Sequence, residues 1–262
     1  MKDILQEIVA QKRREVALLK ASRQAELLQA SPMFSRPTIS LKTALEQSDS
    51  GIIAEFKRKS PSKGWLNQDA EPSSVIPAYE YAGATALSIL TDTLFFGGQL
   101  LDLQKVRGLT ELPILRKDFI LDEIQLLEAR ASGADAVLLI AACLRPDESL
   151  SLARQAHALG LEVLLEIHDE AELDYLTDEI DIVGINNRHL GSFQTDVSRS
   201  FCLAEKLPAC TIKISESGIS QPATVLQLRD KGFRGFLMGE HFMKSTQPGK
   251  TLSNFINQLQ RP

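Results

Sequence analysis

From about residue 50 onward, short apolar runs rich in β-branched residues alternate along the chain with longer segments of helical periodicity. Several of these runs are apolar at successive positions, which is typical of parallel strands that are covered on both faces. We expect eight strands: GIIAEF from Gly51, ATALSIL from Ala84, PILRKDF from Pro113, AVLLIAA from Ala136, EVLLEIH from Glu162, DIVGINN from Asp181, TIKISES from Thr211 and GFLMGE from Gly235.

The segments between the runs predict helices that end in glycine, a common helix stop. Examples are LDEIQLLEARASG, PDESLSLARQAHALG and QPATVLQLRDKG. A series of eight strand–helix units without an interrupting linker predicts an α/β fold, the (β/α)₈ barrel. An open, doubly wound sheet is the alternative. It needs fewer strands and often carries a GxGxxG turn, which is absent after the first expected strand.

The residues before the first run have a different pattern. Apolar positions from Ile4 to Val16 recur at roughly helical spacing among charged residues, which predicts an amphipathic helix. Its polar face carries charges of both signs, which favours packing on the rest of the protein over lying on a membrane surface. We expect residues 1–48 to form a helical extension packed on a barrel of residues 49–262, in a single domain overall.

Composition narrows the class of protein. The chain has 262 residues, 44% of them hydrophobic, and a formal net charge of −5, which argues against a nucleic-acid partner. It shows neither a secretory signal nor the run of about 18 apolar residues that a membrane helix needs. Cys143, Cys202 and Cys210 form no CxxC pair, so we expect three buried thiols in a reducing compartment. These features predict a cytoplasmic protein. The sequence leaves the oligomeric state open, and we expect a monomer or weak homo-oligomer.

Charged and amide side chains gather where the expected strands end, and in such barrels ligands bind at that end. The stretch GIIAEFKRKSPSKGW passes directly from an apolar run into charge. Glu55 and Lys57 share one face of the extended chain. In a barrel mouth such charges need a salt-bridge network or an ionic ligand, because an unpaired buried charge is costly. A single charge at a strand end is usually a solvated loop residue, and we expect Arg58 and Lys59 to point outward. The strands after the first end in Lys117, in Glu166 and His168, in Asn186, Asn187 and Arg188, and in Ser215, Glu216 and Ser217.

Two small-residue turns add a second signal. SESGI places Ser217 and Gly218 after the seventh run, and LMGEHF places Gly239 after the eighth. Barrels hold phosphate with backbone N–H groups in these two loops, where glycine permits close approach. Ser60 in SPSKG offers a third donor. Ordinary βα turns are the alternative. The four histidines are scattered, without HxxxH or His/Cys spacing, so no metal site is expected.

Several of these segments together resemble the indole-3-glycerol-phosphate synthase family of tryptophan biosynthesis over nearly the whole chain. The matching segments are IIAEFKRKSPSKG, ILTDTLFFGG, LRKDFILDEIQLLEARASGADAVLLIAA, LLEIH, GINNR, ISESGI and LMGEHFM. The resemblance implies a barrel with an N-terminal helical extension over the active-site end. It also implies closure of an indole ring from 1-(2-carboxyphenylamino)-1-deoxyribulose 5-phosphate, with loss of carbon dioxide and water. No metal or organic cofactor is implied.

The same resemblance implies roles for individual residues. Lys117 is expected to be the general acid of ring closure and Glu166 the acid or base of dehydration. Lys57 would bind an anionic group of the substrate. Glu55 would orient the lysines, and Asn186 and Arg188 would hold the carboxylate side or the intermediate. Glu216 and Ser217 occupy family site positions, and Phe96 would stack on the anthranilate ring or belong to the core. The phosphate would bind to Ser60, Gly218, Gly239 and the N–H of Glu240. The Glu240 carboxylate would repel a phosphate, so we expect only its backbone to face the ligand.

Three other functions stay open at this point. Phosphoribosylanthranilate isomerase is a related phosphate-binding barrel enzyme, but it would lack the set of Glu55, Lys117 and Glu166. A Schiff-base aldolase would need a lysine of lowered pKa as its nucleophile. A non-catalytic sensor could keep the phosphate site but would have no use for an acid paired with a base. Because Pro262 follows shortly after the eighth unit, we expect one activity rather than two.

Overall fold

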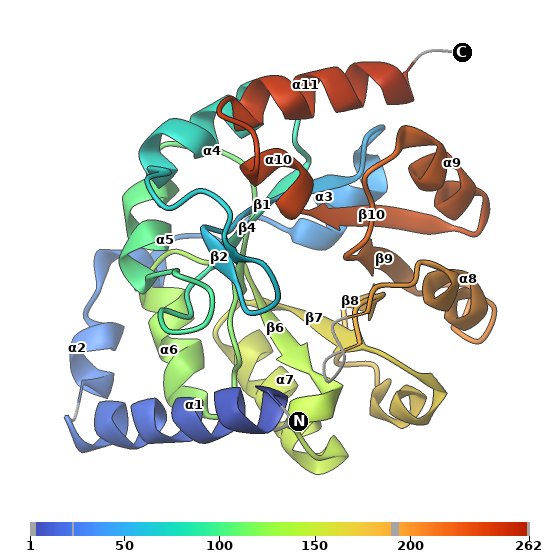
Figure 1. Ribbon diagram of the computed structural model, residues 1–262. Coiled ribbons are helices and arrows are strands. Elements are labelled where there is room, and N and C mark those ends of the chain that lie inside the picture. Colours follow the sequence, from blue (N-terminus) through green and yellow to red (C-terminus); the bar gives the residue numbers. More distant parts are fainter. Residues whose placement is uncertain (1–3, 23, 190–193, 261–262) are drawn as a thin grey trace.

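The computed structural model describes residues 4–22, 24–189 and 194–260. Its centre is a closed barrel of parallel strands in the order β1-β10-β9-β8-β7-β6-β5-β4 (Figure 1). This confirms the predicted (β/α)₈ barrel. The barrel strands are β1 (Ile52–Phe56), β4 (Ala86–Leu90), β5 (Ile114–Lys117), β6 (Ala136–Ile140), β7 (Glu162–Ile167), β8 (Ile182–Asn186), β9 (Ile212–Glu216) and β10 (Phe233–Met238).

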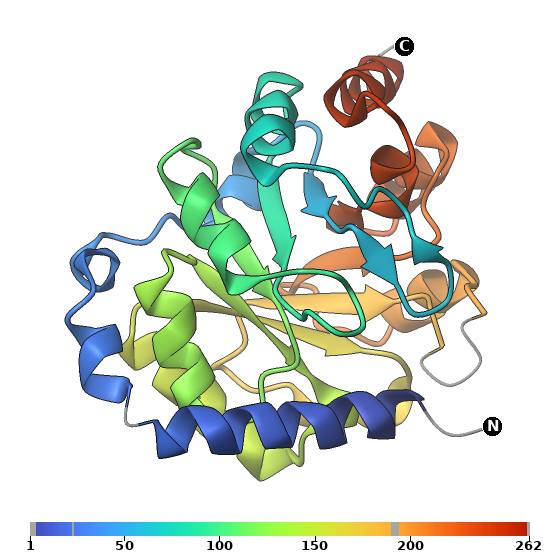
Figure 2. The same ribbon diagram turned by 60° about the vertical axis from the view of Figure 1, so that its left-hand side comes forward.

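Helices surround the barrel, and α11 lies beside α4 and α9 on its outside (Figures 1 and 2). The helices after the first strand are α4 (Pro72–Tyr81), α5 (Leu100–Arg107), α6 (Glu123–Ala131), α7 (Pro146–Ala158), α8 (Ser198–Ala204), α9 (Pro222–Asp230), α10 (Glu240–Met243) and α11 (Pro248–Leu259), with the 3₁₀ segments η2 (Ala141–Cys143) and η3 (Glu170–Tyr175). The strand β7 is thus followed by η3 rather than by an α-helix.

Alternate residues of each strand belong to different cores, which explains why the strands are apolar at successive positions. On β1, Ile52 and Phe56 pack outward into a cluster shared with the surrounding helices. Ile53 points inward and meets Leu115, Leu164 and other inward residues of the barrel. Because Glu55 follows Ile53 by two positions, the same alternation turns its side chain toward the barrel interior.

The segment before β1 contacts both ends of the barrel. It contains α1 (Ile4–Ala21), α2 (Ala25–Gln29), η1 (Pro32–Ser35) and α3 (Leu41–Gln47). Leu41 and Leu45 of α3 join the inner cluster near the strand starts, where Glu162 at the start of β7 accepts a hydrogen bond from the Lys42 N–H at 2.9 Å. Ile8 of α1 joins the same cluster beside Phe119, which lies just after the end of β5. Both α1 and α2 contact α6, and Figures 1 and 2 show α1, in dark blue, lying crosswise to α6.

Three details differ from the expectations. The charged stretch after β1 forms a short hairpin of β2 (Lys59–Ser60) and β3 (Gly64–Trp65), and β10 begins at Phe233, before Gly235. The expectation of buried thiols is wrong for Cys202 and Cys210, which are exposed, while Cys143 is half-buried; all three are free. Cys202 lies on α8, whose buried residues are Ser200, Leu203 and Ala204, and Cys210 lies just before β9. Within the described parts of the chain, we find no helix with both the length and the apolar character to cross a membrane.

Candidate active site

One cavity opens at the carboxyl ends of the barrel strands, with about 1100 Å³ of atom-free space including its opening to solvent. All the residues to which the sequence analysis assigned a role in the site meet around it. They are Glu55, Lys57, Ser60, Phe96, Lys117, Glu166, Asn186, Arg188, Glu216, Ser217, Gly218, Gly239 and Glu240. The strand-end rule therefore located the lining of the cavity, while the roles of these residues stay predictions.

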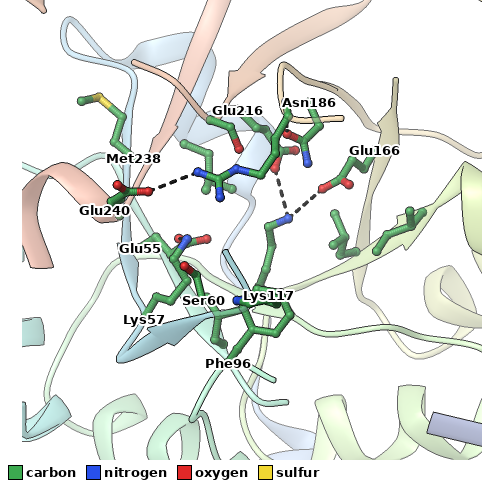
Figure 3. A pocket seen from close by; sticks show the side chains of 18 of the residues that line it. Glu55, Lys57, Ser60, Phe96, Lys117, Glu166, Asn186, Glu216, Met238 and Glu240 are labelled. Carbon is green, nitrogen blue, oxygen red and sulfur yellow. Dashed lines mark hydrogen bonds and ion pairs between the residues drawn. The ribbon is translucent and has the colours of Figure 1, made fainter. Parts of the chain in front are cut away.

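Lys117 lies at the centre of the charged groups and contributes its amine from the end of β5 (Figure 3). Its Nζ is 2.8 Å from Glu166 Oε2 and 3.1 Å from Glu216 Oε2. Both carboxylates are almost fully buried. These contacts join β5, β7 and β9, so residues distant in sequence form one ionic cluster.

A second lysine and carboxylate extend this cluster from β1. Lys57 and Glu55 form an ion pair on the same face of the chain, as their spacing predicted. Two inward glycines make room for the buried carboxylates. A side-chain carbon at Gly239 would overlap Glu55 Oε1, and one at Gly184 would overlap Glu216 Oε1. Glycine at these positions thus permits the close approach of carboxylate and backbone.

The turn after β9 has an unusual backbone. Ser217 has a φ of 67° and Gly218 a φ of 76°, and Ser217 is the one non-glycine residue with positive φ in the described ranges. Buried Asn187 supports the turn, since its Nδ2 donates to Ser215 Oγ at 3.0 Å and to the Ser217 carbonyl at 3.1 Å. Strained residues that their surroundings hold in place often lie at functional sites.

The Glu240 side chain is turned to cations. Arg188 Nη2 lies 3.1 Å from its Oε2, and Lys244 Nζ lies 2.6 Å from its Oε1. Arg188 is itself positioned by its own N–H, which donates to Asn186 Oδ1 at 3.0 Å. The negative charge at the start of α10 is therefore balanced by protein groups.

Burial and charge act in opposite directions on the central pair. Burial alone would lower the pKa of Lys117, but Glu166, Glu216 and Glu55 outweigh it and hold the pKa above its usual value. Burial would raise the pKa of Glu166, but Lys117 and His168 hold it well below its usual value. At neutral pH the site thus contains an ammonium beside an ionised carboxylate.

Glu216 behaves differently from its neighbour. Burial raises its pKa, Glu166 and Glu55 raise it further, and Lys117 offsets this only in part, so that the pKa is about 7. Its Oε1 has no hydrogen-bond partner among the described residues. A carboxyl group with a pKa near neutrality is suited to take up and release a proton.

The charged side chains expected to be solvated or to point outward lie outside the cavity, but Arg58 is paired with buried Asp102 rather than solvated. Arg58 forms two hydrogen bonds to Asp102, at 2.6 and 3.1 Å, and Lys59 donates to the Leu94 carbonyl at 2.9 Å. Neither lines the cavity. The exposed Lys63 does not line it either.

Sequence reasoning missed several lining residues. Ile4, Leu5 and Ile8 of α1 form part of the wall. The helical spacing of these residues identified an apolar face but not what it covers. Phe119, whose ring centroid is 6.0 Å from that of Phe96, was also missed, although it lies only two residues after the predicted Lys117. His241 lines the cavity as well, one residue after the predicted Glu240.

Among the described side chains, no group of three or more His, Cys, Asp and Glu is arranged to hold a metal ion. The buried carboxylates of the cavity are instead paired with lysines.

A closed (β/α)₈ barrel with an ammonium, an ionised carboxylate and glycine-containing turns at its mouth defines a barrel enzyme for a small anionic substrate. Two solved structures share the fold. They are 3-hexulose-6-phosphate synthase from Salmonella typhimurium (TM-score 0.63, 12% identity, 80% of this chain and 100% of that one) and tryptophan synthase subunit alpha from Legionella pneumophila (TM-score 0.62, 14% identity, 83% and 97%).

Sequence comparison identifies the family. The model of indole-3-glycerol phosphate synthase matches residues 5–255. Proteins of that name are 58% identical in Bacteroides thetaiotaomicron, over 99% of this chain and 100% of that protein, and 42% identical in Azoarcus sp., over 96% and 98%. The chain belongs to the indole-3-glycerol phosphate synthase family, which consists of carboxy-lyases of tryptophan biosynthesis that act on a small phosphorylated substrate.

Proposed function

We propose that this chain closes the indole ring of 1-(2-carboxyphenylamino)-1-deoxyribulose 5-phosphate by general acid–base catalysis, with Lys117 as the acid and Glu166 as the acid or base of dehydration. The observation that carries the proposal is the contact of 2.8 Å between these two groups inside one cavity. Ring closure needs a proton at the ketone oxygen, and dehydration needs removal of a proton and departure of a hydroxyl. Two adjacent groups of opposite resting charge suit these tasks.

The protonation state of Lys117 favours this chemistry over a Schiff base. A lysine nucleophile must be neutral, which usually requires a lowered pKa. Here the carboxylates Glu166 and Glu216 hold the pKa of Lys117 above its usual value. The ammonium is therefore present at neutral pH and can donate a proton, while the amine that an aldolase needs is scarce.

The two anionic ends of the substrate would bind in different parts of the cavity. We assign the phosphate to Ser60, Gly218, Gly239 and the N–H of Glu240. The backbone geometry at Ser217 and Gly218 supports this assignment, as does the balanced charge of the Glu240 carboxylate. The first N–H groups of a helix such as α10 lack partners within the helix. Lys57, Asn186 and Arg188 are assigned to the carboxylate side, with Glu55 orienting Lys57.

Wider features of the protein belong to the same proposal. We infer that residues 1–48 act with the barrel as a single domain, because Ile4, Leu5 and Ile8 complete the cavity wall. Phe96 and Phe119 give an aromatic surface for the anthranilate ring. The formal charge of −5 supports a small-molecule substrate rather than nucleic acid. A cytoplasmic location and a monomeric or weakly associating state complete the proposal.

The test follows indole fluorescence when the purified protein meets the carboxyphenylamino-deoxyribulose phosphate without added metal. Lys117→Met and Glu166→Gln should each lower turnover by about 10²–10⁴-fold, the usual contribution of a positioned acid or base, with KM largely kept. Lys231→Met is the matched control, because Lys231 pairs with Glu205 on the surface. Unchanged turnover in either cavity variant would remove that residue from its role. Borohydride trapping of substrate on Lys117 would favour the aldolase alternative.

A further inference from the structure

His168 lies next to the proposed catalytic pair but outside the cavity lining. It follows the end of β7 and stands two positions after Glu166, on the same side of the extended chain. Its side chain is 8% exposed. A buried histidine this close to a catalytic carboxylate affects that group through charge, without touching the substrate.

The two oxygens of Glu166 face two different cations. Oε2 is 2.8 Å from Lys117 Nζ, and Oε1 is 3.3 Å from His168 Nε2. The second contact is an ion pair without hydrogen-bond alignment, since His168 Nε2 has no hydrogen-bond partner among the described residues. Catalytic hydrogen bonds in enzymes without substrate are often long or poorly aligned and shorten in the reacting complex.

The surroundings of His168 favour its charged form. The charged groups that face it are Glu166 from β7, Glu172 from η3 and Arg199 from α8. His168 Nδ1 is 3.4 Å from Glu172 Oε2, and Arg199 Nη1 donates to the His168 carbonyl oxygen at 3.2 Å. Burial alone would lower the pKa of His168, but the two carboxylates outweigh it and raise the pKa to about 9.

The position of Glu172 does not depend on the imidazole alone. Its Oε2 also accepts the backbone N–H of His168 at 2.5 Å, so the main chain ties η3 to the end of β7. The imidazole of His168 is therefore not needed to hold η3 in place, because this backbone hydrogen bond already does so. The contact between His168 Nε2 and Glu166 is not explained by this structural role.

We propose that His168 is a positioning residue whose imidazolium holds Glu166 ionised and aimed into the cavity. Glu172 keeps the imidazolium charged, so that negative and positive groups alternate from Glu172 through His168, Glu166 and Lys117. The inference rests on the proposed role of Glu166 and extends the acid–base set to a residue outside the cavity. Its consequence is that Glu166 stays available as a base at the acid end of the pH range in which the enzyme works.

The test measures kcat/KM of wild type, His168→Asn and Glu172→Gln from about pH 8 down to the lowest pH at which all three proteins stay folded, and divides each variant's value by the wild-type value at the same pH. In His168→Asn, Glu166 loses one of its two cations and its pKa rises, so the ratio should fall toward acid pH, by about tenfold for each pKa unit. KM should change little, because His168 does not line the cavity. In Glu172→Gln the imidazole still faces Glu166 and becomes more fully charged as the pH falls, so the ratio should not decline toward acid pH.

If His168 only connects Glu166 with Glu172 as a structural contact, the result is different. Both variants would then lose activity and stability by an amount that does not depend on pH. A level ratio for His168→Asn, or the same slope in both variants, overturns the proposal. If His168→Asn does not fold, ¹⁵N NMR of the imidazoles in wild type replaces it, and a neutral His168 ring at pH 7 overturns the proposal. Glu166→Gln separates the two levels of inference. If that variant keeps its turnover, the proposed function of Glu166 fails. If it loses turnover while the His168→Asn ratio stays level, only the role of His168 fails.

Discussion

Two largely buried lysines of this chain are each surrounded by carboxylates, yet Lys117 lines the cavity and Lys12 does not. Lys12 of α1 is 2.8 Å from Glu15, 3.1 Å from Asp92 and 3.0 Å from Asp118, and we call these four residues the rim cluster. Lys117 with Glu55, Glu166 and Glu216 forms the mouth cluster. The two clusters have similar composition and different surroundings.

The carboxylates of the rim cluster are committed to the fold. Asp118 accepts hydrogen bonds from the Phe119 N–H at 2.8 Å and the Thr91 hydroxyl at 2.5 Å, and it also pairs with Arg116. Burial would raise its pKa, but Arg116 and Lys12 lower the pKa to about 2. Asp92 accepts the Phe95 N–H at 2.8 Å with its Oδ1, and its Oδ2, which has no hydrogen-bond partner among the described residues, forms the ion pair of 3.1 Å with Lys12. The cluster therefore joins α1 to the loops after β4 and β5.

In the mouth cluster, one oxygen of Glu216 has neither a hydrogen bond nor an ion pair among the described residues. Glu216 shares Lys117 with Glu166, and its pKa is about 7. A buried lysine among carboxylates thus stabilises structure where other donors complete the carboxylates. Where the carboxylates line a cavity and lack such donors, the lysine and the carboxylates can exchange protons.

The two clusters should differ most in how much their lysines contribute to stability. Lys12→Met should lower the free energy of unfolding by about 3–5 kcal/mol, because removing one partner of a buried ion pair leaves uncompensated charge. Lys117→Met should cost less stability, since Glu216 already binds a proton near neutral pH and can stay neutral. Urea unfolding of both variants at neutral pH measures the difference.

The matched control for Lys12 is Lys20→Met on the same helix. Lys20 pairs with Asp122 at 2.8 Å, but its side chain is 52% exposed, so the substitution should have little effect. The comparison between the clusters breaks if Lys12→Met keeps its stability and loses turnover as steeply as Lys117→Met.

Much of the fold could be predicted because its signals are local. Each barrel strand is an apolar run, and helices such as α9 end close to a glycine. The hairpin of β2 and β3 was missed because two residues per strand give no periodicity. The exposure of Cys202 and Cys210 was missed because the tendency of cysteine to be buried is an average that says nothing of a particular helix face.

The site was predictable where it follows from strand position and parity. Glu55, Lys117 and Glu166 end strands of one parallel barrel, so their side chains had to meet. Lys12 could not be found this way. It stands in QKRREV among other charges, and only the packing of α1 against the loops after β4 and β5 distinguishes it from its solvated neighbours. His168 was visible at a strand end, but its partner Glu172 lies on a 3₁₀ segment that the sequence did not predict.

A smaller effect distinguishes the carboxylates of the two clusters by the sign of their pH dependence. The pKa of Glu216 rises on folding from 4.5 to about 7, so the native state binds more protons and wild-type stability falls between these pH values. Glu216→Gln avoids this loss. Its stability relative to wild type should rise across that window by a few kcal/mol, at about 1.4 kcal/mol per pKa unit.

Asp118→Asn should show the opposite sign. Because folding lowers the pKa of Asp118 from 3.8 to about 2, its contribution is present above pH 3.8 and is lost as the pH falls toward 2. The variant should therefore be less stable than wild type at neutral pH and approach it in acid. Urea unfolding as a function of pH measures both variants, and equal signs for Glu216→Gln and Asp118→Asn would contradict the distinction between the clusters.

The smallest expected effect comes from a cation between carboxylates at the surface. His157 Nδ1 is 3.1 Å from Glu179 and its Nε2 is 2.9 Å from Asp181. Burial lowers the pKa of His157, but the two carboxylates raise it above 6.5. Its charge thus stabilises the fold below pH 6.5, and this contribution is lost as the pH rises through the folded pKa.

In His157→Gln the loss of stability should be greater in acid than in alkali by less than about 1 kcal/mol, because the site is partly exposed. Arg154→Gln is the control, since Arg154 pairs with Glu179 at 3.2 Å and stays charged throughout. If His157→Gln loses as much stability in alkali as in acid, the ring acts through its hydrogen bonds alone. The charge of His157 then contributes nothing to stability at this partly exposed site, in contrast to the buried charge of Lys12 in the rim cluster.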